Sequence, residues 1–226
     1  IHAPQYAFRG MCMDLELMDW LNQYTFPEEE KYEDLEYANK AYNIFVEAMK
    51  KSSTTRTCIF ATRHRYATEL LMEKMEKSGL VSYVGKVNMD REASDGLVEE
   101  SANMSAYVTF GWINSVKDKY VNTKPILTPR FIPCCTDQLM EELREIQMAY
   151  GIPVQSHLSE SKSEIEFVKF LRPNNKFYGD SYNEYDLFGK NTDLNHDVKT
   201  IMAHCVWSSE EEVNLMLKNG VFVAHC

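Results

Sequence analysis

Polar side chains follow six short apolar runs of the chain, each at the point where a β-strand is expected to end. They are His2, His64, Arg130, His157, His204 and His225. Because the carboxyl ends of the strands form the active-site face of a (β/α)8 barrel, we expect these side chains to converge on one mouth. Any one histidine could equally be a hydrogen-bonded core residue. Five of the six histidines share this position, however, and only His196 is expected in a loop, which favours a functional site.

His157 and Glu160 have a spacing suited to metal-assisted proton transfer. An imidazole at a strand end can bind zinc, and a carboxylate beside a metal-bound water can take its proton and return it to a leaving group. The alternative is that Glu160 is an acidic residue at a helix start, where the helix dipole favours it. The spacing alone leaves both interpretations open.

Arg130 and Phe131 indicate a site for a planar polar ligand. A guanidinium offers a fork of hydrogen-bond donors, and an aromatic ring offers a flat face. Pro129 biases Thr128 toward extended backbone, which fits a strand that ends here. The alternative for Arg130 is a salt bridge at the rim with one of the many acidic residues.

The elements that must position these side chains alternate between short strands and longer helices. Hydrophobic spacing and capping residues predict helices over 14–23, 33–51, 66–78, 95–118 with an interruption at Gly111, 136–150, 161–171 and 208–220. Apolar runs predict strands over 57–62, 81–87, 125–128, 153–157 and 199–204, and 172–196 is expected to be irregular. The alternation indicates an α/β fold with a parallel sheet. About six such units favour a (β/α)8 barrel, and the lack of a Gly-rich phosphate loop argues against a doubly wound sheet.

Composition excludes several classes of function. The 226 residues include 24 Lys and Arg against 34 Asp and Glu, for a net charge of −10. An acidic chain without basic runs is a poor candidate for binding nucleic acid or an anionic membrane, and no apolar stretch approaches the ~18 residues of a membrane helix. Six scattered cysteines favour free thiols in a reducing cytoplasm over a disulfide scaffold or a thiolate zinc site. Strand-like sequence at both ends leads us to interpret the chain as a piece of a longer polypeptide.

Six segments carry a resemblance to a known family. They are Ile1-His2-Ala3-Pro4-Gln5-Tyr6, Thr25-Phe26-Pro27, Thr128-Pro129-Arg130-Phe131, Gln155-Ser156-His157-Leu158-Ser159-Glu160, Met202-Ala203-His204-Cys205 and Val223-Ala224-His225-Cys226. Together they resemble the guanine deaminases of the amidohydrolase superfamily, from one end of the chain to the other. The first and third segments are more specific to guanine deaminases, whereas the histidine-containing strand ends are shared across the superfamily.

This resemblance implies a fold of the metal-dependent hydrolase type. The chain would be a fragment of a (β/α)8 barrel that lacks the start of strand one and all of strand eight. Residues 1–226 would form an incomplete catalytic barrel domain, without the small β domain that the family builds from its two chain ends.

The resemblance also implies a metal site and its catalytic residues. His2 and His157 match ligands of one zinc ion, with iron as the alternative, and the remaining ligands are expected outside this segment. Glu160 matches the glutamate that shuttles protons, and His204 matches a histidine that contacts the attacking water or the substrate.

Further positions match those that hold the purine in this family. They are Gln5, Arg130 and Phe131, with His157 at the border of the same pocket. His225 matches the start of a strand-seven motif.

The implied activity is the zinc-dependent hydrolysis of guanine to xanthine and ammonia by a metal-activated hydroxide. The resemblance further implies a cytoplasmic homodimer whose partner is a small purine, with neither nucleic acid nor membrane bound. Two alternatives stay open: an amidohydrolase for another amino- or halo-substituted heterocycle, and a catalytically silent barrel. The apolar faces of 33–51 and 136–150 could be dimer surfaces, but we expect them to face the core.

Overall fold

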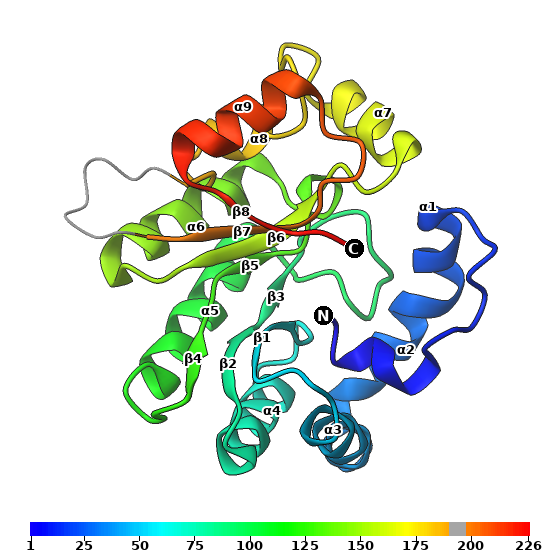
Figure 1. Ribbon diagram of the computed structural model, residues 1–226, viewed down its shortest axis with the longest axis vertical. Helices are drawn as coiled ribbons and strands as arrows, with labels where there is room; N and C mark the ends of the chain where they lie inside the picture. The colour runs from blue at the N-terminus through cyan, green and yellow to red at the C-terminus, as the bar shows by residue number, and fades with distance from the viewer. Residues whose placement is uncertain (190–197) are drawn as a thin grey trace.

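A curved row of parallel strands organises the molecule (Figure 1). The computed structural model describes residues 1–189 and 198–226. The strands are β1 (Arg56–Phe60), β2 (Val81–Gly85), β3 (Val87–Asn88), β4 (Thr123–Pro125), β5 (Thr128–Pro129), β6 (Val154–Leu158), β7 (Thr200–His204) and β8 (Phe222–Ala224). Every pairing among them is parallel.

Strand order in space follows strand order in the chain. Three sheets have the orders β1-β2-β4, β3-β5 and β6-β7-β8. Single bridges from His2 to Phe60 and from Leu127 to Val154 extend the row before β1 and across to β6. Among the described residues the order never reverses, whereas a doubly wound sheet requires a reversal at its switch point. The expectation of an α/β fold with a parallel sheet is therefore confirmed.

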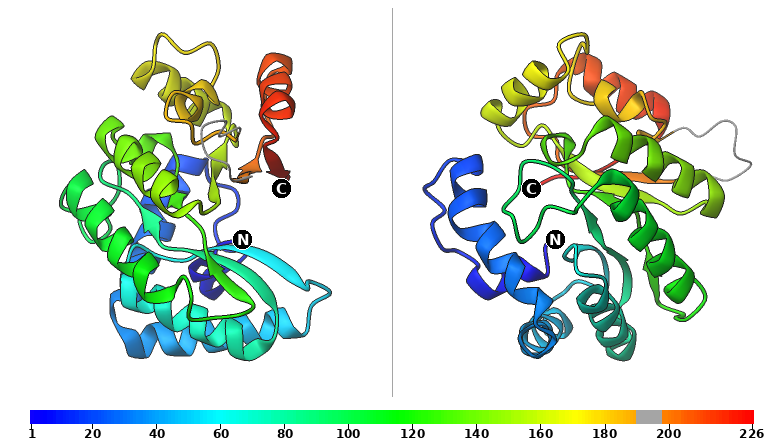
Figure 2. Two further views of the ribbon diagram at one scale, coloured as in Figure 1. Left: turned by 90° about the vertical axis from the view of Figure 1, so that its left-hand side faces the viewer. Right: turned by 180° about the vertical axis from the view of Figure 1, so that it is seen from behind.

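Most of the helices line the outer side of this row (Figures 1 and 2). The α-helices are α1 (Leu17–Trp20), α2 (Phe26–Glu30), α3 (Leu35–Lys50), α4 (Arg65–Ser78), α5 (Ala102–Val116), α6 (Asp137–Tyr150), α7 (Lys162–Leu171), α8 (Asp180–Asn183) and α9 (Glu210–Asn219). Short 3-10 or π turns are η1 (Pro4–Phe8), η2 (Leu21–Thr25), η3 (Lys31–Glu33) and η4 (Ile132–Cys134). No described helix is both long enough and apolar enough to cross a membrane.

Local sequence explains where the long helices begin and end. The side chains of Asp34 and Thr136 accept backbone hydrogen bonds at the starts of α3 and α6. Gly79 and Gly151 end α4 and α6 with φ of 78° and 61°, a left-handed conformation that costs glycine little. These signals fix the ends of the helices, and so the places where the strands between them can begin.

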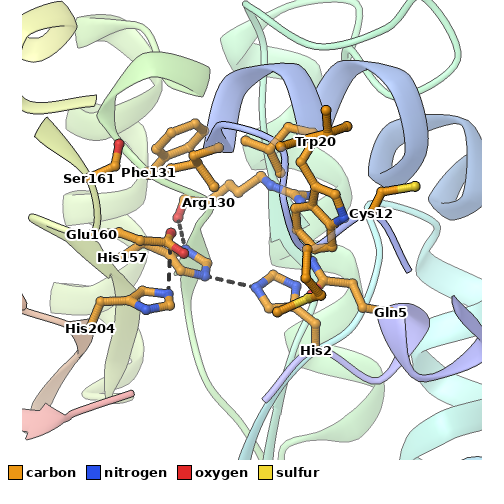
Figure 3. A pocket seen from close by; sticks show the side chains of 14 residues that line it. His2, Gln5, Cys12, Trp20, Arg130, Phe131, His157, Glu160, Ser161 and His204 are labelled. Carbon is orange, nitrogen blue, oxygen red and sulfur yellow. Dashed lines mark hydrogen bonds and ion pairs between the residues drawn. The ribbon is translucent and has the colours of Figure 1, made fainter. Parts of the chain in front are cut away.

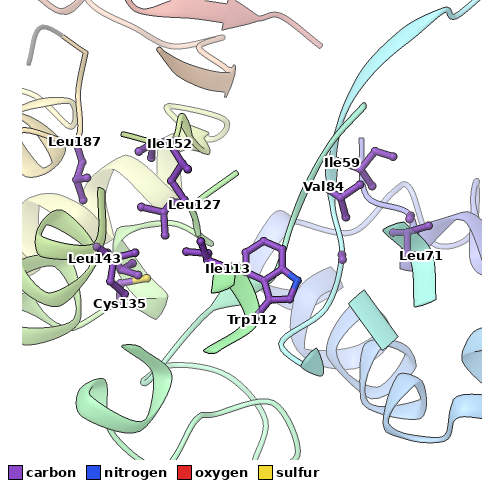
Figure 4. Packing of buried hydrophobic residues seen from close by; sticks show 14 of the residues in the cluster. Ile59, Leu71, Val84, Trp112, Ile113, Leu127, Cys135, Leu143, Ile152 and Leu187 are labelled. Atoms are coloured by element: carbon purple, nitrogen blue, oxygen red, sulfur yellow. The ribbon is translucent and has the colours of Figure 1, made fainter. Parts of the chain in front are cut away.

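The core lies between the strands and the helices (Figure 4). Trp112 of α5 is completely buried in it, together with Ile59 of β1 and Leu143 of α6. The apolar faces of α3 and α6 are buried in the same core. The expectation that these faces point inward, rather than form exposed dimer surfaces, is confirmed.

Several predicted boundaries were wrong. The helix predicted over 14–23 begins only after Glu16, whose carboxylate caps α1, and it then widens into the π turn η2. Helix α5 runs through Gly111 without interruption, and Arg65 packs where a side chain at 111 would lie.

The predicted strands over 81–87 and 125–128 are each two short strands. A Cβ at Gly85 would lie 2.8 Å from the carbonyl oxygen of Ile126, and this close approach coincides with the break in the ladder. The predicted irregular stretch 172–196 contains α8, and its residues 190–196, including His196, lie outside the described residues.

Candidate active site

A cavity of about 390 Å³ lies between the N-terminal segment and the carboxyl ends of β5, β6 and β7 (Figure 3). All seven side chains predicted for the site line it, namely His2, Gln5, Arg130, Phe131, His157, Glu160 and His204. They come from distant parts of the chain, and the strand order brings them together. The remaining wall comes from the segment between Cys12 and Leu21, which sequence reasoning did not assign to the site.

Two of the strand-end histidines do not join this cavity, so the expectation that all six polar side chains converge was wrong. His64 begins α4, where its backbone N–H donates to Thr62 Oγ1, and it lines a separate cavity beside Tyr66. The chain turns outward here into the helix, which carries the imidazole away from the mouth. His225 is exposed, and its Nδ1 donates to the carbonyl oxygen of His204.

His2 and His157 face each other across the floor of the cavity. Their Nε2 atoms are 2.8 Å apart, and Nδ1 of His157 donates to the carbonyl oxygen of Arg130 at 2.6 Å. That hydrogen bond places the proton of His157 on Nδ1 and leaves Nε2 with a lone pair. Burial, then neighbouring charges, holds the pKa of both rings well below the usual range, so both are neutral.

This pair fits a divalent metal ion. Neutral imidazole binds metal through an unprotonated nitrogen, and the hydrogen bond from His157 Nδ1 is the usual outer support of such a ligand. Nδ1 of His2 is buried without a hydrogen-bond partner and lies 3.9 Å from the Glu29 carboxylate. A proton on that atom would face Glu29 and leave Nε2 free. Among the described residues no three His, Cys, Asp or Glu side chains cluster as a ligand set, so two imidazoles are all that this pair offers to an ion.

Glu160 and His204 lie on the same side of the cavity as His157, whose ring is stacked on that of His204 with 5.4 Å between the ring centres (Figure 3). Glu160 Oε2 is 3.3 Å from His204 Nε2. Burial, and then the Glu164 carboxylate, raises the pKa of Glu160 to about 7, against a smaller opposing effect of Arg130. A carboxyl group with this pKa exchanges protons readily near neutral pH.

The backbone around these two residues is held in place. The backbone N–H groups of Glu160 and Ser161 donate to Glu164 Oε2 at the start of α7. Ser159 and His204, at the ends of β6 and β7, have φ of 50° and 73°. Non-glycine residues adopt this left-handed region at an energetic cost, and such residues cluster at functional sites.

Arg130 is another of the residues that line the cavity. Its Nη1 and Nη2 donate to the two carboxylate oxygens of Glu29 at 2.5 and 3.1 Å, and both side chains are buried. The alternative of a salt bridge at the rim was wrong in its location, because this ion pair is internal. Burial acts to lower the pKa of Arg130, but the charge and hydrogen bonds of Glu29 raise it overall.

Two residues that support the site were missed by sequence reasoning. Glu29 is the second of three consecutive glutamates, and nothing in that run distinguishes it from its neighbours. The hydroxyl of Tyr182, in α8, donates to the carbonyl oxygen of His157 at 2.8 Å and lies 2.9 Å from Ser156 Oγ. Tyr182 belongs to the stretch 172–196, in which no periodic signal marked it.

The fold and the cavity together define an α/β protein of sequential parallel units with a histidine pair and a carboxylate at the strand ends. The chain belongs to the Amidohydrolase family, whose sequence profile matches residues 1–226. This family implies a divalent metal ion, which the histidine pair fits.

Several relatives of the chain are guanine deaminases. The guanine deaminase of Rattus norvegicus is 40% identical over 227 residues, which cover 100% of this chain and 48% of the relative. The guanine deaminase of Escherichia coli is 33% identical over 230 residues, which cover 100% of this chain and 49% of the relative. A crystal structure of guanine deaminase from C. acetobutylicum with bound guanine has a TM-score of 0.94 and 45% identity, covering 100% and 52%. The resemblance to guanine deaminases is thus confirmed, and the chain spans about half the length of these relatives.

Proposed function

We propose that the protein to which this chain belongs hydrolyses guanine to xanthine and ammonia with one zinc ion, iron being the alternative metal. The observation that carries the proposal is the composition of a single cavity. It combines a pair of neutral imidazoles, a carboxyl group with a pKa of about 7, and a buried arginine beside an aromatic ring. The similarity to guanine deaminases supports the same substrate.

We further propose that the chain is part of a (β/α)8 barrel. The curved row of strands in chain order supports this fold, since barrel strands follow one another without reversal. The eighth strand, the start of the first and a small β domain would lie outside residues 1–226. The same outer segments would supply the remaining metal ligands.

In this proposal His2 and His157 hold the ion through their Nε2 atoms. When bound, zinc lowers the pKa of a coordinated water toward about 7 and so makes it a nucleophile at neutral pH.

Glu160 is the proton carrier of the proposed reaction. Its carboxylate takes a proton from the attacking water and delivers it to a ring nitrogen of guanine, which makes the amino-bearing carbon electrophilic. The water oxygen then bonds to that carbon. Glu160 next takes the remaining proton of the added hydroxyl group and passes it to the amino nitrogen, so that the C–N bond breaks and ammonia leaves. A pKa of about 7 suits both directions of transfer. His204 lies 3.3 Å from Glu160 and helps orient the water.

Gln5, Arg130 and Phe131 are the proposed purine-binding residues. Arg130 and Gln5 would donate to or accept from the polar edge of the ring, and Phe131 would pack beside it. All three line the same cavity.

We also propose a cellular compartment and an oligomeric state for the protein. All six cysteines lie in the described ranges and are free thiols, which supports the cytoplasm as the compartment. The homodimer stays a prediction, and sedimentation of the full-length protein tests it.

The test is conversion of guanine to xanthine by the full-length protein, followed by ultraviolet absorbance with and without a zinc chelator. We expect conversion that the chelator abolishes and added zinc restores. If the folded, metal-loaded protein leaves guanine intact but hydrolyses another amino- or halo-substituted heterocycle, that heterocycle is the substrate instead of guanine. Folded protein that binds no metal would favour the silent barrel.

A further inference from the structure

Helix α2 holds Arg130 from two sides. The guanidinium donates to both carboxylate oxygens of Glu29, at 2.5 and 3.1 Å, and its carbon lies 5.0 Å from the ring centre of Phe26. Glu29 is 0% exposed and Arg130 is 2% exposed, although 101 residues separate them in the chain. Arg130 lines the cavity and Glu29 does not, so the carboxylate acts on the cavity through the arginine.

The pairing changes what Arg130 offers to a ligand. A guanidinium has five N–H donors, and Glu29 accepts from two of them, which leaves three N–H groups without this partner. The carboxylate also cancels the positive charge, at a depth where water screens charges poorly. An unpaired buried arginine would bind a carboxylate, a phosphate or an ionised ring strongly. The Arg130–Glu29 pair has no net charge, so Arg130 offers hydrogen-bond donors without that attraction.

Among the described residues that line the cavity there is no lysine and no second arginine. The titratable groups around it are His2, Cys134, His157 and Glu160. An imidazole carries no permanent charge, Cys134 is a buried thiol, and Glu160 can only add negative charge.

We propose that Glu29 determines specificity: by neutralising Arg130, it makes the cavity accept uncharged purines and disfavour anionic ones. This inference rests on the proposed function, because it concerns the purine pocket of that reaction. It has a consequence for turnover, because the product xanthine is a weak acid that becomes anionic when it loses a proton. A neutral wall does not hold that anion, so Glu29 would limit inhibition by product.

The test compares a neutral and an anionic purine as competitive inhibitors of the metal-loaded, full-length enzyme at pH 7.5. The probes are hypoxanthine, which is uncharged at this pH, and urate, which is a monoanion. The measured quantity is the ratio of their inhibition constants against guanine. Glu29→Gln keeps the length of the side chain but removes its charge, and Glu29→Asp keeps the charge but shortens the side chain.

We expect Glu29→Gln to strengthen inhibition by urate relative to hypoxanthine by about tenfold or more. The reason is that a buried cation without its partner carboxylate then faces the ligand. Glu29→Asp should leave the ratio within about threefold of the wild type, even though its KM for guanine rises. Glu28→Gln is the matched control, because Glu28 pairs with Lys31 and does not line the cavity. It should change neither the ratio nor KM.

A purely structural role for Glu29 predicts the opposite order. The isosteric Gln would then be the milder change, and both inhibitors would bind more weakly to the same extent in either variant. The same ratio of inhibition constants in Glu29→Gln, Glu29→Asp and the wild type would overturn the proposal.

If Glu29→Gln does not fold, Arg130→Gln tests the same point, with the opposite expected change in the ratio. It leaves the carboxylate unpaired and should shift the ratio against urate, and an unchanged ratio would again overturn the proposal. A wild-type enzyme that does not turn over guanine would instead refute the proposed function.

Discussion

The ring of His157 is oriented by the main chain of Arg130, whose carbonyl oxygen accepts a hydrogen bond from His157 Nδ1 at 2.6 Å. The two residues come from different strand ends, after β5 and within β6. One residue therefore serves two proposed functions: its side chain borders the purine pocket, and its backbone fixes the tautomer of a metal ligand. A change in the path of β5 would disturb binding of purine and of metal together.

Removal of His157 should abolish metal binding. For His157→Ala in the full-length protein we expect zinc affinity to fall by about 100-fold or more. Loss of a residue that only hydrogen-bonds a metal ligand already lowers affinity by about 10- to 100-fold, and loss of the ligand itself should lower it at least as much. Zinc content after dialysis, measured by atomic emission, checks this. His64→Ala is the control, because His64 also follows a strand but lines another cavity. Equal zinc loss in both variants would contradict the assignment.

Glu160 should control the acid side of the pH profile. Its pKa is about 7, and it must be deprotonated to accept a proton, so kcat/KM of the wild type should rise as the pH increases through about 7. Glu160→Gln should lower kcat by about 10²- to 10⁴-fold and remove this rise from the residual activity. The measurement is a pH–rate profile of both proteins. Glu166→Gln, an exposed change on α7, the helix that follows Glu160, should keep the wild-type profile. A rise that persists in Glu160→Gln would assign it to another group.

Tyr182 should support the metal site from behind. Tyr182→Phe removes the donor to the carbonyl oxygen of His157 and the partner of Ser156 Oγ. We expect a loss of about 1–3 kcal/mol in the free energy of unfolding, because buried polar groups lose their partner. Zinc affinity should also fall by about tenfold. Denaturant titration and competition with a zinc-binding dye measure the two effects.

The control for Tyr182 is Tyr120→Phe. The Tyr120 hydroxyl is buried without a hydrogen-bond partner among the described residues. Its removal should leave stability unchanged or slightly higher. A similar loss of zinc affinity in both variants would contradict a specific role for Tyr182.

A buried ion pair behind the strands should matter for stability alone. Lys86 Nζ lies 2.5 Å from Glu99 Oε1, and the two side chains are 0% and 6% exposed. Lys86→Met should destabilise the protein by about 3–5 kcal/mol, because the Glu99 charge stays buried without its partner. Lys50→Met, in a surface pair with Glu47, should cost at most about 1 kcal/mol. Urea titrations of the two variants give the comparison, and equal costs would contradict the argument.

Sequence reasoning predicted the features that local chemistry fixes. Hydrophobic spacing identified the core faces of α3 and α6, and strand-end position identified four of the side chains that line the cavity, namely His2, Arg130, His157 and His204. It failed for His64, because the direction in which a side chain leaves a strand end depends on the turn that follows. It could not identify Glu29, because three adjacent glutamates are equivalent until a fold selects the one that meets Arg130.

The order of the strands also has a consequence for how the protein folds. Each β/α unit pairs with the unit next to it in the chain, so most of the sheet can grow through contacts of short sequence separation, which form quickly. The contact between His2 and His157 is different, since 155 residues separate them. It can form only once the intervening units have assembled and curved. Recovery of activity after dilution from denaturant would therefore report this final closure, later than the return of helical circular dichroism.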